Sequence, residues 1–226
     1  MITLADIHRL FRSDEVETTA LRAIDLNIEP GEFVAIMGPS GCGKSTLLNI
    51  VGLIDRPSSG RYLFKGREVT DLDEAALARL RRDHLGFVFQ SFNLIDELTI
   101  AENVELGLVY RRWAGKERKA RVDAAMDRVG VAHRAKHYPH QLSGGQQQRA
   151  AIARAIVGEP DLILADEPTG NLDTENGEQV MDILTSLNAE GATIVMVTHS
   201  PAHADIAKRV VNMLDGRIIV SARRAA

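Results

Sequence analysis

The chain has 226 residues, with 27 basic and 31 acidic side chains and a formal net charge of −4. This length suffices for one domain with a single core, and the lack of a basic excess argues against a nucleic-acid partner. The one cysteine, Cys42, excludes an internal disulfide and fits a reducing compartment. No segment reads as a signal peptide or a membrane span, so we expect any membrane association to depend on a partner protein.

Three short apolar runs predict buried strands. They are Glu32 to Met37, Leu162 to Ala165 and Ala192 to Val197, with a proline or glycine one or two residues before each and polar loop residues after it. Runs that are apolar on both faces are typical of parallel strands covered by helices. The sequence therefore predicts the α/β class.

The middle of the chain has a different pattern, with helical periodicity from about Ile100 to Val157 and few strand signals. One apolar helix stripe is expected at Val122, Ala125, Met126 and Val129. We therefore expect one domain made of an α/β core, residues 1–88 and 160–226, with an inserted α-helical subdomain, residues 89–159.

Six basic residues lie close together within this helical pattern: Arg111, Arg112, Lys116, Arg118, Lys119 and Arg121. They are the best candidate for a local basic patch. The alternative is a solvated helix face, and it is favoured because charge runs on helices usually face water.

A glycine-rich segment, GPSGCGKST, directly follows the first predicted strand. Its spacing, G-x-x-x-x-G-K-[ST], lets backbone N–H groups and a helix N-terminus hold phosphate groups. Lys44 supplies a cation for the β- and γ-phosphates, Ser45 a hydroxyl ligand for Mg²⁺ and Thr46 a second hydroxyl. The expected nucleotide contacts are Gly38, Pro39, Ser40, Gly41, Cys42, Gly43, Lys44, Ser45 and Thr46. The alternative is a glycine-rich turn without a ligand, which the strand–loop–helix context disfavours.

Two acidic residues, Asp166 and Glu167, end the segment LILADE. The carboxyl end of a strand is where open α/β sheets place their ligands. We expect Asp166 to hold Mg²⁺ through water and Glu167 to act as the general base on the attacking water. The alternative is a surface acidic pair, but together with the phosphate loop the pair predicts a P-loop NTPase.

A second candidate anion site is LSGGQ, Leu142 to Gln146, which precedes a helical pattern running to Ile156. A helix N-terminus with glycine amides and a small hydroxyl favours anions. One nucleotide does not need two phosphate-binding loops from one chain, so we expect two chains to pair head to tail. Ser143, Gly144, Gly145 and Gln146 would then contact the nucleotide of the other chain. The alternative is an ordinary helix cap.

These motifs in this order resemble the ABC ATPase family over nearly the whole chain. The resemblance implies that Phe11 stacks on adenine, that Gln90 senses Mg²⁺ and that His199 contacts the γ-phosphate. It also implies that Asp173 contacts the opposite subunit at the shared site. Each residue has a structural alternative: a core aromatic for Phe11, a strand-end residue for Gln90 and His199, and a helix cap for Asp173. The resemblance implies ATP hydrolysis with Lys44, Gln90, Glu167 and His199 as catalytic residues, and Mg²⁺ on Ser45, Gln90 and Asp166.

Longer strings, IMGPSGCGKSTLLNIVGLID and ILADEPTGNLD among them, are similar to the MacB/LolD-type branch of this family. The resemblance implies a cytoplasmic homodimer at the inner face of the membrane, driving a separate permease by mechanotransmission. Lipoprotein release or export of a peptide or antibiotic would be its task, and an FtsE-like cell-division ATPase is the alternative. Cys42, Asp96 and Gly107 depart from the branch's usual residues. A soluble P-loop kinase and a nucleic-acid or ribosome ABC protein fit less well, given LSGGQ and a single cassette.

Overall fold

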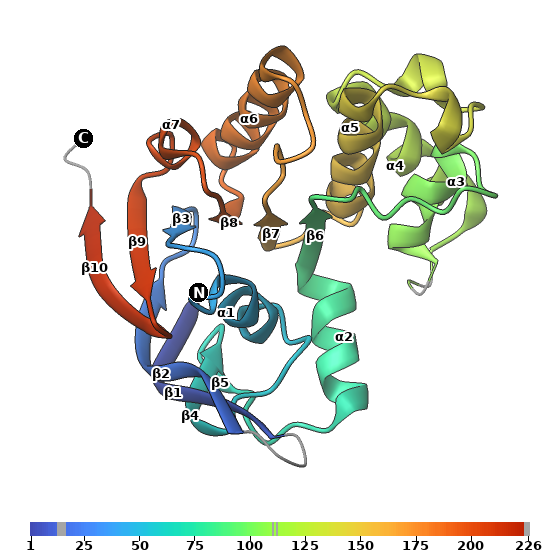
Figure 1. Ribbon diagram of the computed structural model, residues 1–226. Helices are drawn as coiled ribbons and strands as arrows, with labels where there is room; N and C mark the ends of the chain where they lie inside the picture. Colours follow the sequence, from blue (N-terminus) through green and yellow to red (C-terminus); the bar gives the residue numbers. More distant parts are fainter. Residues whose placement is uncertain (13–16, 110, 112, 224–226) are drawn as a thin grey trace. The chain divides into compact units, whose positions relative to one another are not determined.

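The structure is a computed structural model that describes residues 1–12, 17–109, 111 and 113–223. The chain forms two compact units, whose elements are labelled in Figure 1. The first unit joins Met1–Arg81 to the segment that begins at Thr193, and the second is Arg82–Ala192. The second unit is therefore an insertion into the first along the chain.

The first unit contains an antiparallel sheet with the strand order β2-β1-β4-β5. Its strands are β1 (Ile2–Arg12), β2 (Glu17–Ile28), β4 (Ser59–Phe64) and β5 (Arg67–Glu68). In β2, Ile24, Leu26 and Ile28 are buried while Asp25 and Asn27 between them are exposed. This alternation is typical of an antiparallel sheet with one face on the core and one in water.

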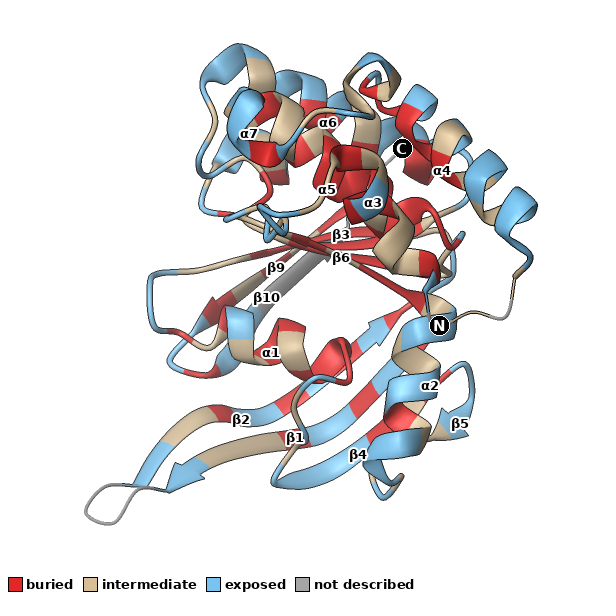
Figure 2. Cartoon of the chain, turned by 90° about the vertical axis from the view of Figure 1, so that its right-hand side faces the viewer, coloured by how far each residue is buried: buried red, intermediate tan, exposed pale blue. Residues whose placement is uncertain are grey.

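The first unit also contains parallel strands, in which β3 pairs with both β8 and β9. The strands are β3 (Phe33–Met37), β8 (Thr193–Val197), β9 (Arg209–Leu214) and the antiparallel edge strand β10 (Arg217–Arg223). Helix α1 (Lys44–Val51) lies between this layer and the antiparallel sheet and contacts β2 and β8 (Figure 2). A short helix, α7 (Pro201–Ala204), follows β8, and α2 (Glu74–His84) ends at the start of the second unit. The position of α1 buries the phosphate-loop helix on two sides.

The described part of the second unit contains two parallel strands, β6 (Leu85–Phe89) and β7 (Leu162–Asp166), and four complete helices. The helices are α3 (Ile100–Glu105), α4 (Gly115–Arg128), α5 (Gly144–Ile156) and α6 (Thr174–Ala189), with 3-10 turns at Leu106–Leu108, Ala132–Arg134 and Pro139–Gln141. Helix α5 packs against β6, α3, α4 and α6, and most of its residues are buried (Figures 1 and 2). This central helix is the one that LSGGQ begins.

The predicted strands and helix stripe are confirmed. All three apolar runs form parallel strands, β3, β7 and β8, within a residue or two of the predicted bounds. Val122, Ala125, Met126 and Val129 are all buried, as the stripe along α4 requires. The antiparallel sheet was not predicted, and the division at residues 88/89 and 159/160 stays a prediction.

Gly107, one of the departures from the branch's usual residues, has a structural reason. A Cβ at this position would lie 2.6 Å from the carbonyl oxygen of Arg154 and 2.7 Å from a methyl group of Val157. The turn Leu106–Leu108 therefore approaches the end of α5 more closely than any side chain allows. Proline, which the resemblance to the branch leads one to expect here, would place atoms in that space.

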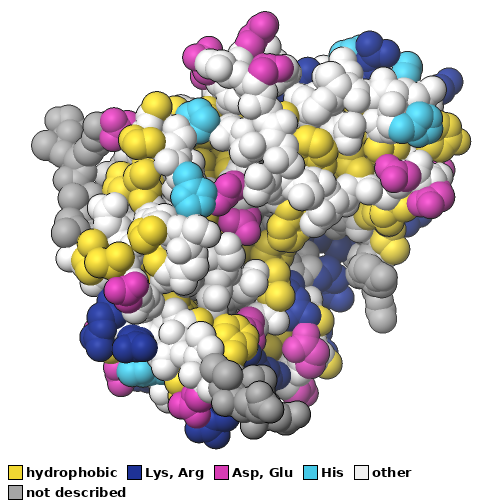
Figure 3. All heavy atoms as spheres, in the orientation of Figure 1, with side chains coloured by type: hydrophobic (Ala, Val, Ile, Leu, Met, Phe, Trp, Pro, Cys, Tyr) yellow, Lys and Arg dark blue, Asp and Glu magenta, His cyan; other side chains and the backbone are white. Residues whose placement is uncertain are grey.

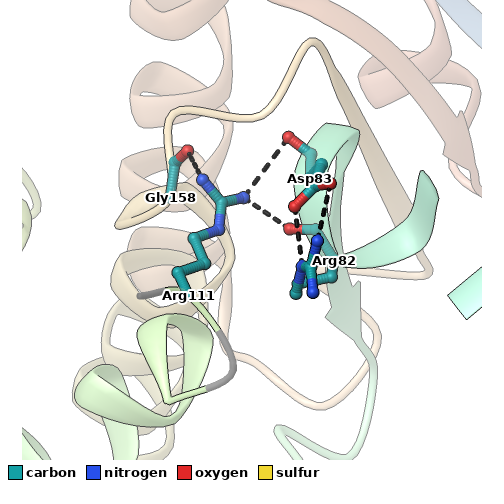
Figure 4. A network of polar contacts seen from close by, with 4 residues as sticks. All are labelled: Arg82, Asp83, Arg111 and Gly158. Carbon is teal, nitrogen blue, oxygen red and sulfur yellow. Dashed lines mark hydrogen bonds and ion pairs between the residues drawn. The ribbon is translucent and has the colours of Figure 1, made fainter. Parts of the chain in front are cut away.

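The basic cluster is largely used within the fold. Arg111 donates to the carbonyl oxygens of Gly158 and Arg82 at 2.5 Å each, so that it ties two chain segments together (Figure 4). Arg121 lies over the ring of Trp113, its guanidinium carbon 3.8 Å from the centroid, and forms an ion pair with Glu159 at 2.9 Å. Arg112 lies outside the described residues.

Charge is mixed on the surface: acidic and basic side chains are interspersed on the face shown in Figure 3. Within the described part of the chain, no helix combines the length and the apolar character needed to cross a bilayer.

Candidate functional site

The phosphate loop ends at a helix whose first turn has no side-chain cap. Gly43 is the N-cap of α1, with φ 101°, and it makes no side-chain cap hydrogen bond with the first-turn amides. A Cβ on Gly43 would lie 2.6 Å from the carbonyl oxygen of Ala20, so glycine is required by both conformation and space. The N–H groups of this turn therefore form a positive helix end, which favours an anion.

Lys44 is buried, with 6% of its surface exposed, and folds back over this loop. Its Nζ donates to the carbonyl oxygens of Gly38 and Pro39 at 2.9 and 2.8 Å. A buried ammonium group is costly unless it is hydrogen-bonded, and these carbonyls supply that compensation. The cation is thus held at the loop where phosphate oxygens would replace or join its two carbonyl partners.

Phe11, near the end of β1, is not a core residue: it is 43% exposed. The guanidinium carbon of Arg9 lies 4.4 Å from its ring centroid, and Arg9 also pairs with Asp55 at 2.9 Å. The alternative of a core aromatic is therefore wrong, and the ring has an exposed surface. Arg9 has no place in the predicted motifs; its separation from Phe11 by two residues on a strand is the only sequence signal for this contact.

The phosphate loop and His199 leave the same edge of the parallel strands. Ile36 of β3 pairs with Val197 of β8, so Gly38 and His199 each follow, by two residues, one member of a matched pair. His199 is exposed. This arrangement brings two of the predicted phosphate contacts to one end of the first unit.

An equivalent edge exists in the second unit, where Phe89 of β6 pairs with Asp166 of β7. Gln90 comes directly after Phe89, and Glu167 directly after Asp166. Gln90 and the acidic pair, predicted from separate motifs, therefore meet at the carboxyl ends of adjacent strands.

Glu167 has a strained backbone, with φ 46°. A left-handed conformation at a residue other than glycine costs of order 1–3 kcal/mol and clusters at functional sites. The turn is closed by the N–H of Gly170, which donates to the carbonyl oxygen of Glu167 at 3.0 Å. Other described residues, Lys65 and Asp215 among them, also have positive φ, so this conformation alone does not decide between a functional role for Glu167 and a surface acidic pair.

Gln90 forms a reciprocal amide pair with Asn171. Its Nε2 donates to Asn171 Oδ1, and Asn171 Nδ2 donates to the carbonyl oxygen of Gln90, both at 3.1 Å. The predicted Mg²⁺-sensing residue is therefore held by the segment that contains Asp173. The sequence identified Gln90 but gave no signal for its partner.

LSGGQ begins a helix, as predicted, and its serine also caps that helix, which was the alternative interpretation of the motif. Ser143 is the N-cap of α5: its Oγ accepts from the N–H of Gln146 at 3.3 Å, and its own N–H donates to Gln146 Oε1 at 3.2 Å. Gly145 is buried against Asn176 at the start of α6. The predicted anion site is thus also a capping box.

Asp173 caps α6, as its alternative reading proposed. It accepts from the backbone N–H of Asn176 at 2.9 Å and from the Asn176 side-chain amide. These hydrogen bonds lower the pKa of Asp173 below its usual value of 3.8. The cap leaves this carboxylate exposed, as a contact with another subunit would require.

The donor types fit Mg-ATP. In the first unit Ser45 offers a hydroxyl oxygen, and in the second unit Asp166 offers a carboxylate oxygen; Mg²⁺ prefers oxygen ligands. Among the residues that the structure describes, no group of three or more His, Cys, Asp or Glu could hold a metal ion. Mg²⁺ needs no such group, because it usually binds one or two protein oxygens together with substrate phosphates and water.

Comparison with known proteins identifies the class. The family model described as ABC transporter matches residues 21–170. The chain is 50% identical over 219 residues to the uncharacterized ABC transporter ATP-binding protein YknY of Bacillus subtilis (strain 168), covering 97% of this chain and 95% of YknY. The chain therefore belongs to the ABC transporter family, and it is an ATP-binding, ATP-hydrolysing cassette.

Two further comparisons refine this class. The macrolide export ATP-binding/permease protein MacB of Azoarcus sp. (strain BH72) is 52% identical over 97% of this chain, but the chain spans only about a third, 33%, of that MacB. The fold matches the ATP-binding cassette MJ0796, solved as a dimer bound to ADP and Pi, with a TM-score of 0.92, 44% identity and full coverage of both chains. A P-loop NTPase fold of the ABC type and the likeness to the MacB/LolD-type branch are thereby confirmed.

Proposed function

We propose that two copies of this chain close on ATP and thereby drive a separate membrane permease of MacB/LolD type. The observation that carries the proposal is that one chain has two glycine-rich helix starts, at α1 and at α5. In a head-to-tail dimer, the α1 loop of each chain and the α5 start of the other would bind one nucleotide between them. The dimeric MJ0796 cassette, at 44% identity, supports this assembly.

In this mechanism the chain's own residues position the nucleotide and the attacking water. The phosphate loop and Lys44 bind the phosphates, and the exposed ring of Phe11 receives the adenine. Glu167 takes a proton from the water as it attacks, and Gln90 and His199 orient the groups around the γ-phosphate. Mg²⁺, held by Ser45, Gln90 and Asp166, would neutralise charge on the phosphates.

The coupled process follows from the open and closed states of the dimer. ATP joins the two chains and hydrolysis releases them, so each nucleotide state favours a different permease conformation. The chain would work in the cytoplasm, at the inner face of the membrane, through that permease. The relatives named macrolide export proteins support export of an antibiotic as the task. Lipoprotein release and peptide export rest on the resemblance to the MacB/LolD-type branch alone.

The test separates binding from hydrolysis. Glu167→Gln removes the general base without altering size, so we expect ATP to convert the purified variant from monomer to dimer while hydrolysis falls at least about 100-fold. Size-exclusion chromatography with light scattering, with and without ATP, measures the assembly. Adding Ser143→Arg should abolish the dimer but not ATP binding. Hydrolysis at the native rate in Glu167→Gln would refute the general-base role, and an ATP-dependent dimer in the double variant would refute the head-to-tail assembly.

A second experiment tests the partner. The tagged chain, expressed from its native locus, should co-purify with an integral membrane protein when ATP is present. Detergent extraction followed by mass spectrometry identifies that protein, and Lys44→Met provides the matched control. Recovery of the chain without any membrane protein would count against a permease-coupled role.

A further inference from the structure

Gln148 is a completely buried polar residue, 0% exposed, in the helix that LSGGQ begins. Its Nε2 donates to the carbonyl oxygen of Pro168 at 2.6 Å and to that of Phe89 at 3.3 Å. Pro168 directly follows Glu167, and Phe89 directly precedes Gln90. One side-chain amide therefore joins α5 to the backbone beside two residues of the proposed hydrolytic machinery.

The two acceptors determine which way this amide points. Both N–H bonds of Gln148 face carbonyl oxygens, whereas its Oε1 is buried and has no hydrogen-bond partner among the described residues. Reversing the amide would place Oε1 against two other oxygens, which is repulsive. The buried, unpaired Oε1 is unfavourable, so it does not hold the side chain in this orientation. The two donated hydrogen bonds do.

Arg154 adds a second connection from the same helix to the same loop. Its Nη2 donates to the carbonyl oxygen of Phe92 at 2.8 Å, and its Nη1 to that of Asn93 at 2.5 Å. Phe92 and Asn93 both have positive φ, 60° and 52°, so this stretch is strained. Helix α5 therefore holds the backbone on both sides of Gln90.

We propose that Gln148 is a positioning residue that couples LSGGQ to the hydrolytic residues of its own chain. A shift of α5, when Ser143 engages the partner's nucleotide, would be transmitted through the Gln148 amide to Gln90 and Glu167 together. In each copy, nucleotide bound at the site that its LSGGQ completes would thus change the position of Gln90 and Glu167, which act at the second site of the dimer. The inference rests on the roles proposed above for Gln90, Glu167 and LSGGQ.

The main test replaces Gln148 with methionine, which has a similar length but no donor. We expect kcat to fall about 10- to 100-fold, since small displacements of reacting groups cost that much, while the Kd for ATP changes less than about 2-fold. Hydrogen exchange at the amides of residues 90–93 should become faster. Gln148→Asn, which keeps the amide but is one methylene shorter, should give a smaller loss in kcat and remains informative if the methionine variant does not fold.

The matched control is Asn188→Leu. Asn188 is also buried, at 8% exposed, and its Nδ2 donates to the carbonyl oxygen of Ala192 at 2.7 Å, at the far end of α6. Its loss should lower the melting temperature as much as Gln148→Met but leave kcat per folded molecule unchanged. A positioning role further requires that the effects of Gln148→Met and Gln90→Ala on kcat be non-additive.

The outcomes separate the inference from the function on which it rests. If Glu167→Gln is inactive but Gln148→Met has the native kcat, or loses only what Asn188→Leu loses, the positioning role is refuted and the proposed function stands. If Glu167→Gln itself hydrolyses ATP normally, the proposed function fails on its own measurement. A fall in kcat at constant Kd, coupled to Gln90, supports the inference.

Discussion

Helices α1 and α5 both have glycines where they begin, before the first turn of α1 and within the first turn of α5, and the two first turns are capped differently. Helix α1 begins after Gly43, in a left-handed conformation and without any side-chain cap. Helix α5 begins after Ser143, whose hydroxyl and backbone form a reciprocal capping box with Gln146. The first start leaves its amides available for a ligand, whereas the second already satisfies part of its own.

This difference has an energetic consequence. An anion at α1 adds hydrogen bonds to amides that no side chain satisfies, which favours lasting occupancy. An anion at α5 must replace or share the internal bond between Ser143 and Gln146, so its net gain is smaller. The difference suits a cassette in which the nucleotide stays on one chain and the signature of the other chain engages and releases it.

The largest expected effect breaks the binding site at α1. Lys44→Met should reduce ATP hydrolysis by at least about 100-fold, because it removes the cation that stabilises phosphate charge. The folded state should be no less stable, since the substitution also removes a buried charge with two carbonyl partners. Phosphate release and thermal unfolding measure the two effects. Lys119→Met, at an exposed lysine of α4 that pairs with Asp123, is the control and should be unchanged in hydrolysis.

The next prediction compares glycines at the two helix starts. Gly43→Ala should lower the free energy of unfolding by about 1–3 kcal/mol, because of its positive φ and the 2.6 Å approach to Ala20. Gly144→Ala should change it by less than about 1 kcal/mol, as alanine favours helix and its Cβ would meet Leu172 at an ordinary 3.5 Å. Urea unfolding without nucleotide measures both. Equal losses would show that the two loops are equally constrained.

A smaller effect is expected at the capping box of α5. Ser143→Ala removes the hydroxyl that accepts from Gln146, so we expect about 1 kcal/mol less unfolding free energy. Ser143→Thr keeps the hydroxyl and should lose less. ATP affinity of the isolated monomer should not change, since only the partner's nucleotide would meet this residue. A lower ATP affinity of the Ser143→Ala monomer would contradict the proposal that α1 binds the nucleotide of its own chain and α5 that of the partner.

The smallest effect concerns pH and the cap of α6. Because hydrogen bonds lower the pKa of Asp173 in the folded state, its contribution to stability is complete above its usual value of 3.8. That contribution is lost as pH falls through the lower folded-state value. The stability difference between the native chain and Asp173→Asn should therefore shrink from pH 6 to pH 3, as urea midpoints would show. A stability difference that grows on acidification would contradict a lowered pKa of Asp173 in the folded state.

Much of the fold was predictable because the local residue pattern of these segments matches the environment that they occupy in the folded chain. Phe33 to Met37 is apolar on both faces and forms the central member of its parallel strands, and Lys44 begins a helix where the glycine spacing predicted one. The antiparallel strands were harder to predict. The alternation of buried and exposed residues is interrupted where the pairing of β1 with β2 shifts register, next to Asp6 and Ala23, which have positive φ. The sequence therefore contains no uninterrupted two-residue hydrophobic pattern that would predict these strands.

The motifs also identified residues better than they identified partners. Gln90, Ser143 and Asp173 stand in recognisable strings, but the residues that hold them do not. The Asn171 side chain accepts a hydrogen bond from the side chain of Gln90. The Gln148 side chain donates to the backbone carbonyl oxygens of Phe89, at the end of β6, and Pro168, just after β7. These contacts join positions far apart along the chain, and no local spacing encodes such a distance.

By itself, the sequence determined the class of nucleotide-binding protein, the family and the order of the elements, because glycine spacing, the lysine that follows it and apolar runs act over a few residues. Only the tertiary structure decided that Lys44 is held by Gly38 and Pro39, that Glu167 is strained, and that Gln148 joins the signature helix to Phe89 and Pro168. The physical reason is burial. A polar group out of water must find its partner wherever the packed chain places one, and packing is a property of the whole fold.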